Sequence, residues 1–290
     1  MTLLSITQTV ANRLQLPSPA TVISNTDNNV ILIRSMLEKA LLDLKDIFPW
    51  PKLQREHTFT LATSTASYAL PLDFDRFLNE TMWNRDQNWP LIGPINAQEW
   101  QNWKSGIVTT LPRQRFRVKG WTDNQMFIDP TPSSDENGQT CVFEYISSTI
   151  VKPKVWVAST VWTGIQYCSY NGNIYTRGST GVATTGTTAP THSTGAVTDG
   201  LITWTFTNAI FQSFVHDTDD VILDETMVID GTVWRFKEER GLDFEDLRQQ
   251  AENKIDTMKT KLSGSGVVTI NSGSVQTPMI GTWSYPEGSY

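Results

Sequence analysis

An apolar stripe in residues 28–48 constrains the fold of this chain more than any other feature of its sequence. Apolar side chains recur there at spacings of three and four residues, the period of a helix with one buried face. They are Val30, Ile33, Leu37, Leu41, Leu44 and Phe48. Asp27 or Asn28 can cap the start, and Pro49 and Pro51 end the helix because proline disfavours helical geometry in the preceding residue. The pattern predicts a long helix that buries one face.

Helical patterns recur at both ends of the chain. Ser5 can cap a short helix near the start. After residue 211, Asp219 or Asp220 can cap one helix, and Asp243 can cap a last helix whose apolar residues continue to Leu262. We therefore expect a helical domain built from the long N-terminal helix and two C-terminal helices.

Between residues 53 and 146 the apolar period changes to two, which is typical of half-buried strands. The expected strands are His57–Leu61, Ala66–Leu70, Arg115–Lys119, Gln125–Ile128 and Cys141–Ile146, with a short helix at Ala97–Trp103. Turn-rich segments separate them. The fold class predicted is α+β, with a small antiparallel β domain beside the helices.

Residues 152–208 differ in composition from the rest of the chain. They hold 14 of its 38 threonines but only four charged residues. Asn171-Gly172 and Asp199-Gly200 are dipeptides that favour tight hairpin turns. Expected strands are Val155–Val161, Tyr167–Ser169, Asn173–Thr176 and Leu201–Thr207, and residues 178–196 are expected to be disordered. We interpret 152–208 as an all-β module inserted into a core formed by 1–151 and 209–262, with 263–290 as an extended tail.

Charge and composition exclude several classes of protein. The net charge is −7, and residues 211–290 alone carry 14 acidic against 7 basic residues. A dedicated nucleic-acid binder needs a basic surface, so this acidity argues against one. No stretch is long and apolar enough to predict a membrane span, and the first residues show no secretory signal.

The sequence shows no pattern typical of a catalytic or metal site. The three histidines are isolated, and Cys141 and Cys168 are too few for a thiolate zinc site. No phosphate-binding loop or nucleophile motif is present. We therefore predict a protein with no cofactor, no metal and no enzymatic activity, made in a reducing cytoplasm.

Three segments are candidate interaction surfaces. On a strand, Arg113, Arg115, Arg117 and Lys119 share one face, which either protects a sheet edge, contacts an acidic neighbouring subunit or partner, or contacts phosphate. In the module, Trp162, Tyr170, Tyr175 and Trp204 are candidates for a contact surface, although some aromatic residues must form its core. In the tail, the apolar and aromatic residues Val275, Ile280, Trp283, Tyr285 and Tyr290 indicate docking to a partner.

Four short motifs, in this order, resemble head-to-tail adaptors of short-tailed bacteriophages, of the connector or tail tubular protein A type. They are FPWPKL at 48–53, YALPLDF at 68–74 followed by Arg76, IDPTP at 128–132 leading to FEYI at 143–146, and LDFE at 242–245. The resemblance covers about 1–150 and 211–262. The module at 152–208 is not part of this resemblance. Its YNGNIY segment at 170–175 resembles a small β module of phage tail proteins and, loosely, chitin-type carbohydrate-binding modules.

The resemblance implies a structural virion protein at the head–tail junction. It implies a ring of subunits, twelvefold by family, that binds the portal, offers a platform for the tail nozzle protein and tail fibres, and lets DNA pass without specific binding. The tail residues would then dock to the portal and the basic strand would contact the next subunit. Two alternatives stay open. The first is a carbohydrate-binding tail or fibre-attachment protein that acts through the module. The second is a hydrolase of cell-wall glycans.

Overall fold

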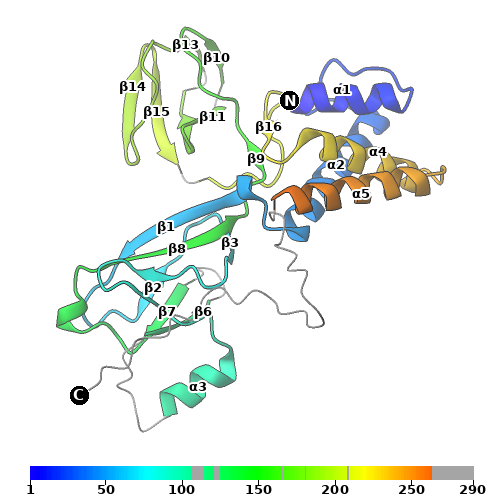
Figure 1. Ribbon diagram of the computed structural model, residues 1–290. Coiled ribbons are helices and arrows are strands. Elements are labelled where there is room, and N and C mark those ends of the chain that lie inside the picture. The colour runs from blue at the N-terminus through cyan, green and yellow to red at the C-terminus, as the bar shows by residue number, and fades with distance from the viewer. Residues whose placement is uncertain (106–113, 121–124, 165, 180, 208, 263–290) are drawn as a thin grey trace, which may run out of the picture.

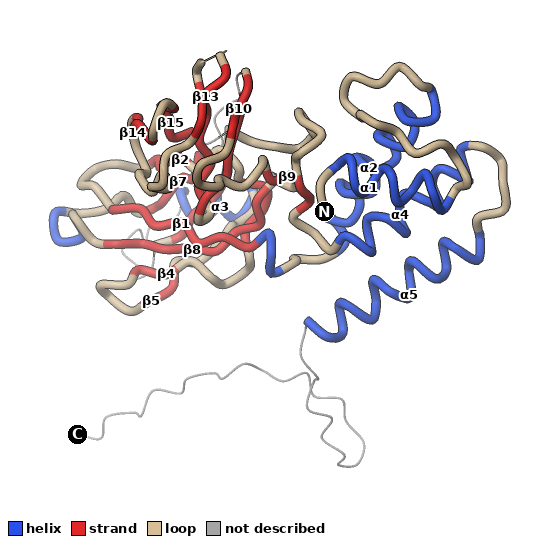
Figure 2. Tube along the Cα trace, turned by 90° about the horizontal axis from the view of Figure 1, so that it is seen from above, coloured by secondary structure: helices blue, strands red, loops and turns tan. Residues whose placement is uncertain are grey.

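A computed structural model describes residues 1–105, 114–120, 125–164, 166–179, 181–207 and 209–262. It shows an α+β fold in which four of the five described helices gather on one side, and the strands lie on the other side together with the remaining short helix (Figures 1 and 2). The fold class predicted from the sequence is therefore confirmed.

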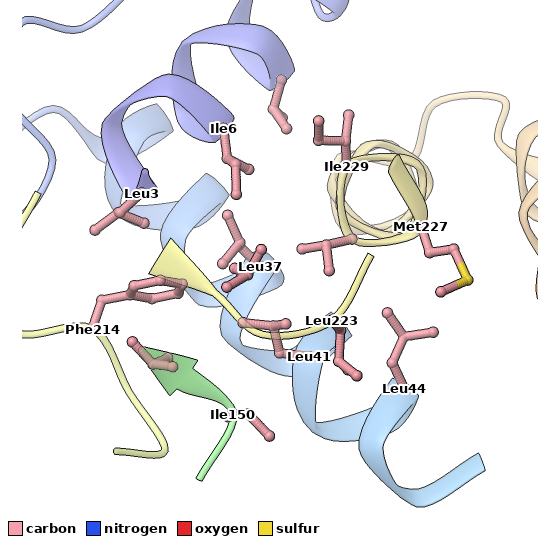
Figure 3. Packing of buried hydrophobic residues seen from close by; sticks show 14 of the residues in the cluster. Leu3, Ile6, Leu37, Leu41, Leu44, Ile150, Phe214, Leu223, Met227 and Ile229 are labelled. Carbon is pink, nitrogen blue, oxygen red and sulfur yellow. The ribbon is translucent and has the colours of Figure 1, made fainter. Parts of the chain in front are cut away.

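The helical part combines both ends of the described chain. Helices α1 (Leu3–Arg13) and α2 (Asn28–Ile47) pack against α4 (Glu225–Glu239), and α4 packs against α5 (Glu245–Leu262). Figure 3 shows the buried side chains between them, including Leu37 and Leu41 of α2 and Ile229 of α4. Helix α4 lies at the centre of this group because it contacts the other three helices.

Helix α2 follows the sequence prediction closely. The Asp27 side chain caps it by accepting a hydrogen bond from the backbone N–H of Asn29 at 2.7 Å. The apolar stripe is buried from Val30 to Leu44, and the helix ends at Ile47, so Phe48 follows the helix and is half-buried. Trp50 then folds back, and its indole Nε1 donates to the carbonyl oxygen of Leu44 at 2.6 Å. This bond satisfies one of the free carbonyls at the helix end.

Two predicted helix starts were wrong. Helix α1 begins at Leu3 with Thr2 as its cap, so Ser5 lies inside the helix. Helix α4 begins at Glu225, and its cap is Asp224 rather than Asp219 or Asp220. Strand β16 (Asp220–Val221) occupies the segment before it and pairs with β9 (Val151–Lys152). Strand pairing therefore overrides the helical spacing of the apolar residues there.

The β domain is a sandwich of two antiparallel sheets. One sheet has the order β1-β8-β4-β5, and β3 also pairs with β8; the other has the order β2-β7-β6. The bounds are β1 (Gln54–Thr60), β2 (Ser67–Ala69), β3 (Phe74–Phe77), β4 (Trp83–Asn84), β5 (Trp89–Pro90), β6 (Arg115–Lys119), β7 (Gln125–Asp129) and β8 (Thr140–Ser147). Helix α3 (Ala97–Ser105) precedes β6, and single turns lie at Pro51–Leu53 and Ser134–Glu136.

The segment between β9 and β16 contains a separate set of strands around its own buried cluster. Its main sheet has the order β11-β12-β15-β14, and β10 pairs with β13. The bounds are β10 (Val161–Thr163), β11 (Gln166–Tyr170), β12 (Asn173–Arg177), β13 (Val182–Thr184), β14 (Ala196–Asp199) and β15 (Ile202–Thr207). The strand predicted from Val155 begins only at Val161, and residues predicted to be disordered include β13 and the buried Thr185.

Candidate interaction surfaces

The two sheets of the β domain face each other through a shared aromatic cluster. Phe77 of β3 contacts Phe116 of β6, with ring centroids 5.3 Å apart, and Phe143 of β8 at 4.9 Å. Because side chains alternate along a strand, the residues next to these core positions face outward. The outer faces of the two sheets therefore point in opposite directions.

The basic strand β6 lies in this sandwich with the predicted alternation. Phe116 is 2% exposed, whereas Arg115 and Arg117 are half-buried and Lys119 is exposed. Arg115 already has internal partners, because its Nη1 lies 3.2 Å from Glu99 Oε1 and its guanidinium lies 4.1 Å from the Trp103 ring centroid.

Arg117 and Lys119 differ from Arg115 in their partners within the described part of the chain. Among the described residues, neither Arg117 nor Lys119 has a carboxylate within 4 Å. Lys119 Nζ lies 4.2 Å from the Phe127 ring centroid. Arg113 falls outside the described residues.

The module uses most of its predicted contact residues as core. Trp162, Tyr175 and Trp204 are each 1% exposed or less, and the indole rings of Trp162 and Trp204 are 5.1 Å apart. The prediction of these three as a contact surface is therefore corrected, because a small module has few other large side chains with which to exclude water. Only Tyr170 is half-buried, and Trp156 packs against it edge to face at 5.7 Å.

A cleft of about 190 Å³ lies beside the tip of the β11–β12 hairpin, and residues of the hairpin and of the segment around β9 line it. The tip is the predicted Asn171-Gly172 turn, with both residues at positive φ. Arg55 and Thr149 lie on the opposite side of the cleft. Nearby, Tyr167 of the module packs against Phe211, with centroids 4.9 Å apart.

Asp73 of the YALPLDF motif makes hydrogen bonds within the β domain, and Arg76, which follows the motif, joins this domain to helix α2. The sequence pattern did not indicate either role. Asp73 accepts hydrogen bonds from the Tyr145 hydroxyl at 2.8 Å and the Ser147 hydroxyl at 2.6 Å. Arg76 Nη2 donates to the carbonyl oxygen of Lys45 in α2 at 3.1 Å. The Asp-x-Asp-Arg pattern at 73–76 was the available signal, but only the structure supplies its partners.

Polar contacts also brace helix α4. Asp230 lies 2.5 Å from Arg13 Nη1 of α1 and 2.7 Å from Lys254 Nζ of α5. Arg235 Nη2 lies 2.7 Å from Asp43 Oδ2 of α2. These pairs set how the four helices are placed relative to one another.

Acidic residues at the ends of helices α4 and α5 divide into two groups. Asp224 and Glu225 act locally at the start of α4, where Asp224 accepts from the backbone N–H groups of Thr226 and Met227. Glu238, Glu239, Glu245 and Asp246 are exposed around the α4–α5 turn. These four exposed carboxylates form an acidic surface at the α4–α5 turn.

The predicted docking residues Val275, Ile280, Trp283, Tyr285 and Tyr290 lie outside the described residues. Within the described part, no three histidine, cysteine or acidic side chains converge as metal ligands, and no helix there is both long and apolar enough to span a membrane. Burial raises the pKa of the Cys141 and Cys168 thiols to about 12. Neither thiol is therefore a ready nucleophile near neutral pH.

The profile of a family described as SU10 adaptor protein matches residues 1–164. The match covers α1, α2, the β domain and the first strand of the module. No curated protein matches the chain.

Proposed function

The chain belongs to the SU10 adaptor protein family. We propose from this that it is a head-to-tail adaptor of a short-tailed phage.

 We propose that the subunits form a closed ring, twelvefold as in the resembled adaptors, which joins the portal to the tail nozzle protein and tail fibres. The family itself indicates a structural component of the phage virion that interacts with other virion proteins. The observation that carries the proposal is the family match over 1–164, which spans more than half of the chain.

The arrangement of the helices supports a ring. Helices α1, α2, α4 and α5 form one group, and α5 contributes few buried residues, so most of its surface is open to a neighbour. Contacts between two different surfaces of the same chain generate rings when the rotation closes. The head–tail junction of the virion is the place that we propose for this ring.

The charge of the chain supports a conduit through which DNA passes without specific binding. Residues 211–290 are strongly acidic, and Glu238, Glu239, Glu245 and Asp246 are exposed. An acidic wall repels phosphates and releases no counterions when DNA passes. We expect negligible affinity for duplex DNA at low salt, measured by fluorescence anisotropy. Micromolar affinity that is lost in R115E/R117E would contradict the conduit and place these arginines in the channel.

A narrower role in glycan contact or fibre attachment is proposed for the module. The half-buried pair Trp156 and Tyr170 lies beside the 190 Å³ cleft, and the Trp156 indole N–H is held by Asp199 at 2.9 Å. A fixed aromatic pair beside polar groups suits stacking on a sugar ring. Glycan-array binding that is lost in Tyr170→Ala supports this role, and binding that is unchanged in Tyr170→Ala contradicts it.

A further inference from the structure

The outer face of the larger sheet carries two carboxylates that lie directly opposite each other. Glu56 of β1 and Glu144 of β8 are register partners, and both are exposed. Like charges at such positions repel each other. Among the described residues, Arg85 Nη2 lies 3.9 Å from Glu56, and no cation lies within 4 Å of Glu144. Within the described part of the chain, this face is therefore acidic, with Arg85 as the cation nearest to Glu56.

The outer face of the smaller sheet has the opposite charge. Arg117 and Lys119 of β6 have no carboxylate within 4 Å among the described residues, whereas Arg115 is paired with Glu99. Phe116, which lies between Arg115 and Arg117 in the sequence, is buried in the sandwich. The alternation of the strand therefore turns Arg117 and Lys119 away from the core.

The acidic and the basic face cannot meet within one chain. Phe143 of β8 and Phe116 of β6 both enter the cluster between the sheets, so Glu144 and Arg117 lie on opposite sides of it. Two complementary surfaces on opposite sides of a domain suit head-to-tail contact between copies. Exposed charge pairs are individually weak, but they select the partner and the register of a contact.

We propose that Arg117 and Lys119 of one subunit contact Glu56 and Glu144 of the next subunit. The inference rests on the proposed ring, and it names the surfaces through which the β domains of neighbouring copies meet. The occupant of each face is a second copy of this chain, because the described part of the same chain supplies both the acidic face and the basic face.

Charge reversal tests the contact. The variant R117E/K119E makes both faces acidic, and E56K/E144K makes both faces basic. We expect each variant alone to lose ring assembly at least tenfold, measured by mass photometry with the portal protein of the same phage present. An equimolar mixture of the two variants restores complementary faces at every contact of an even-numbered ring, so we expect assembly to return.

The control variant K39E/K52E carries the same charge change as R117E/K119E at exposed positions outside α5 and outside both sheet faces, and it should assemble like the wild type. Circular dichroism checks that every variant is folded. Assembly of both reversed variants alone, or failure of the folded mixture to assemble, would overturn the contact. A wild-type chain that forms no ring with or without portal would instead contradict the proposed function, and the contact with it.

Discussion

Lys45 and Asp75 form an ion pair that ties the last turn of α2 to strand β3, with Lys45 Nζ 2.8 Å from Asp75 Oδ1. The Lys45 side chain is only 10% exposed, and Asp75 also lies 3.2 Å from Arg76 Nη1. The pair is thus one of the polar links between the helices and the β domain.

Lys45→Met should reduce the free energy of unfolding by about 1–3 kcal/mol, because it removes one partner of a poorly solvated pair. Urea unfolding followed by circular dichroism measures the change. The control is Lys39→Met on the exposed side of the same helix, for which we expect a change within about 0.5 kcal/mol. Equal effects of the two substitutions would show that the pair contributes no stability of its own.

Trp162→Ala should destabilise the module by about 3–5 kcal/mol, because it opens a cavity beside Trp204 in a small core. Hydrogen exchange measured by mass spectrometry should show lost protection in peptides of 166–207 but not in α2. The control is Trp83→Ala, since Trp83 is 39% exposed. Loss of protection in α2 as well would mean that the module is part of the main core rather than a separate unit.

His57 should make stability depend on pH. Burial beside Phe143 lowers the pKa of the imidazole below its ordinary value of 6.5, and the charge of Asp73 only partly opposes this shift. As the pH falls below 6.5, the unfolded chain therefore binds a proton at His57 more readily than the folded chain does. The free energy of unfolding decreases as the pH decreases.

The His57→Phe variant lacks the imidazole that binds this proton. The free energy of unfolding of the wild type should therefore fall relative to that of the variant between pH 7.5 and pH 5, as measured by urea unfolding at several pH values. Parallel pH profiles for the two proteins would contradict the assignment. Both proteins contain the same carboxylates, so the contribution of these groups to the pH dependence of stability cancels in the comparison.

Deletion of residues 268–290 should abolish binding to the portal and leave the melting temperature of the remaining chain nearly unchanged. The deleted segment carries a single charge and includes Trp283, Tyr285 and Tyr290, which suits docking by apolar contact. Pull-down with purified portal protein measures binding. Binding of the shortened chain at the level of the full chain would exclude the tail as the docking arm.

Local patterns predicted the elements whose structure depends on neighbours in the sequence. The stripe from Val30 to Leu44 and the cap at Asp27 need only helical spacing and one side-chain oxygen, and both were found. Strand β6 was predicted with its bounds, because alternating Arg and apolar residues show which side faces the core.

Features that depend on distant pairing could not be predicted in this way. Asp219 resembles a helix cap, but Val221 pairs with Val151, and this contact is absent from the local pattern. The opposition of Glu56 and Glu144 depends on the register of two strands far apart in the sequence. The burial of Trp204 depends on which side of a sheet becomes the interior, which composition does not determine.

Electron cryo-microscopy of the chain mixed with the portal protein of the same phage tests the central claim most directly. The account predicts a closed ring of this chain bound to the portal, with twelve copies and the basic face of each β domain against the acidic face of the next. A portal that carries no density for the chain, or carries isolated copies without a ring, would contradict the account.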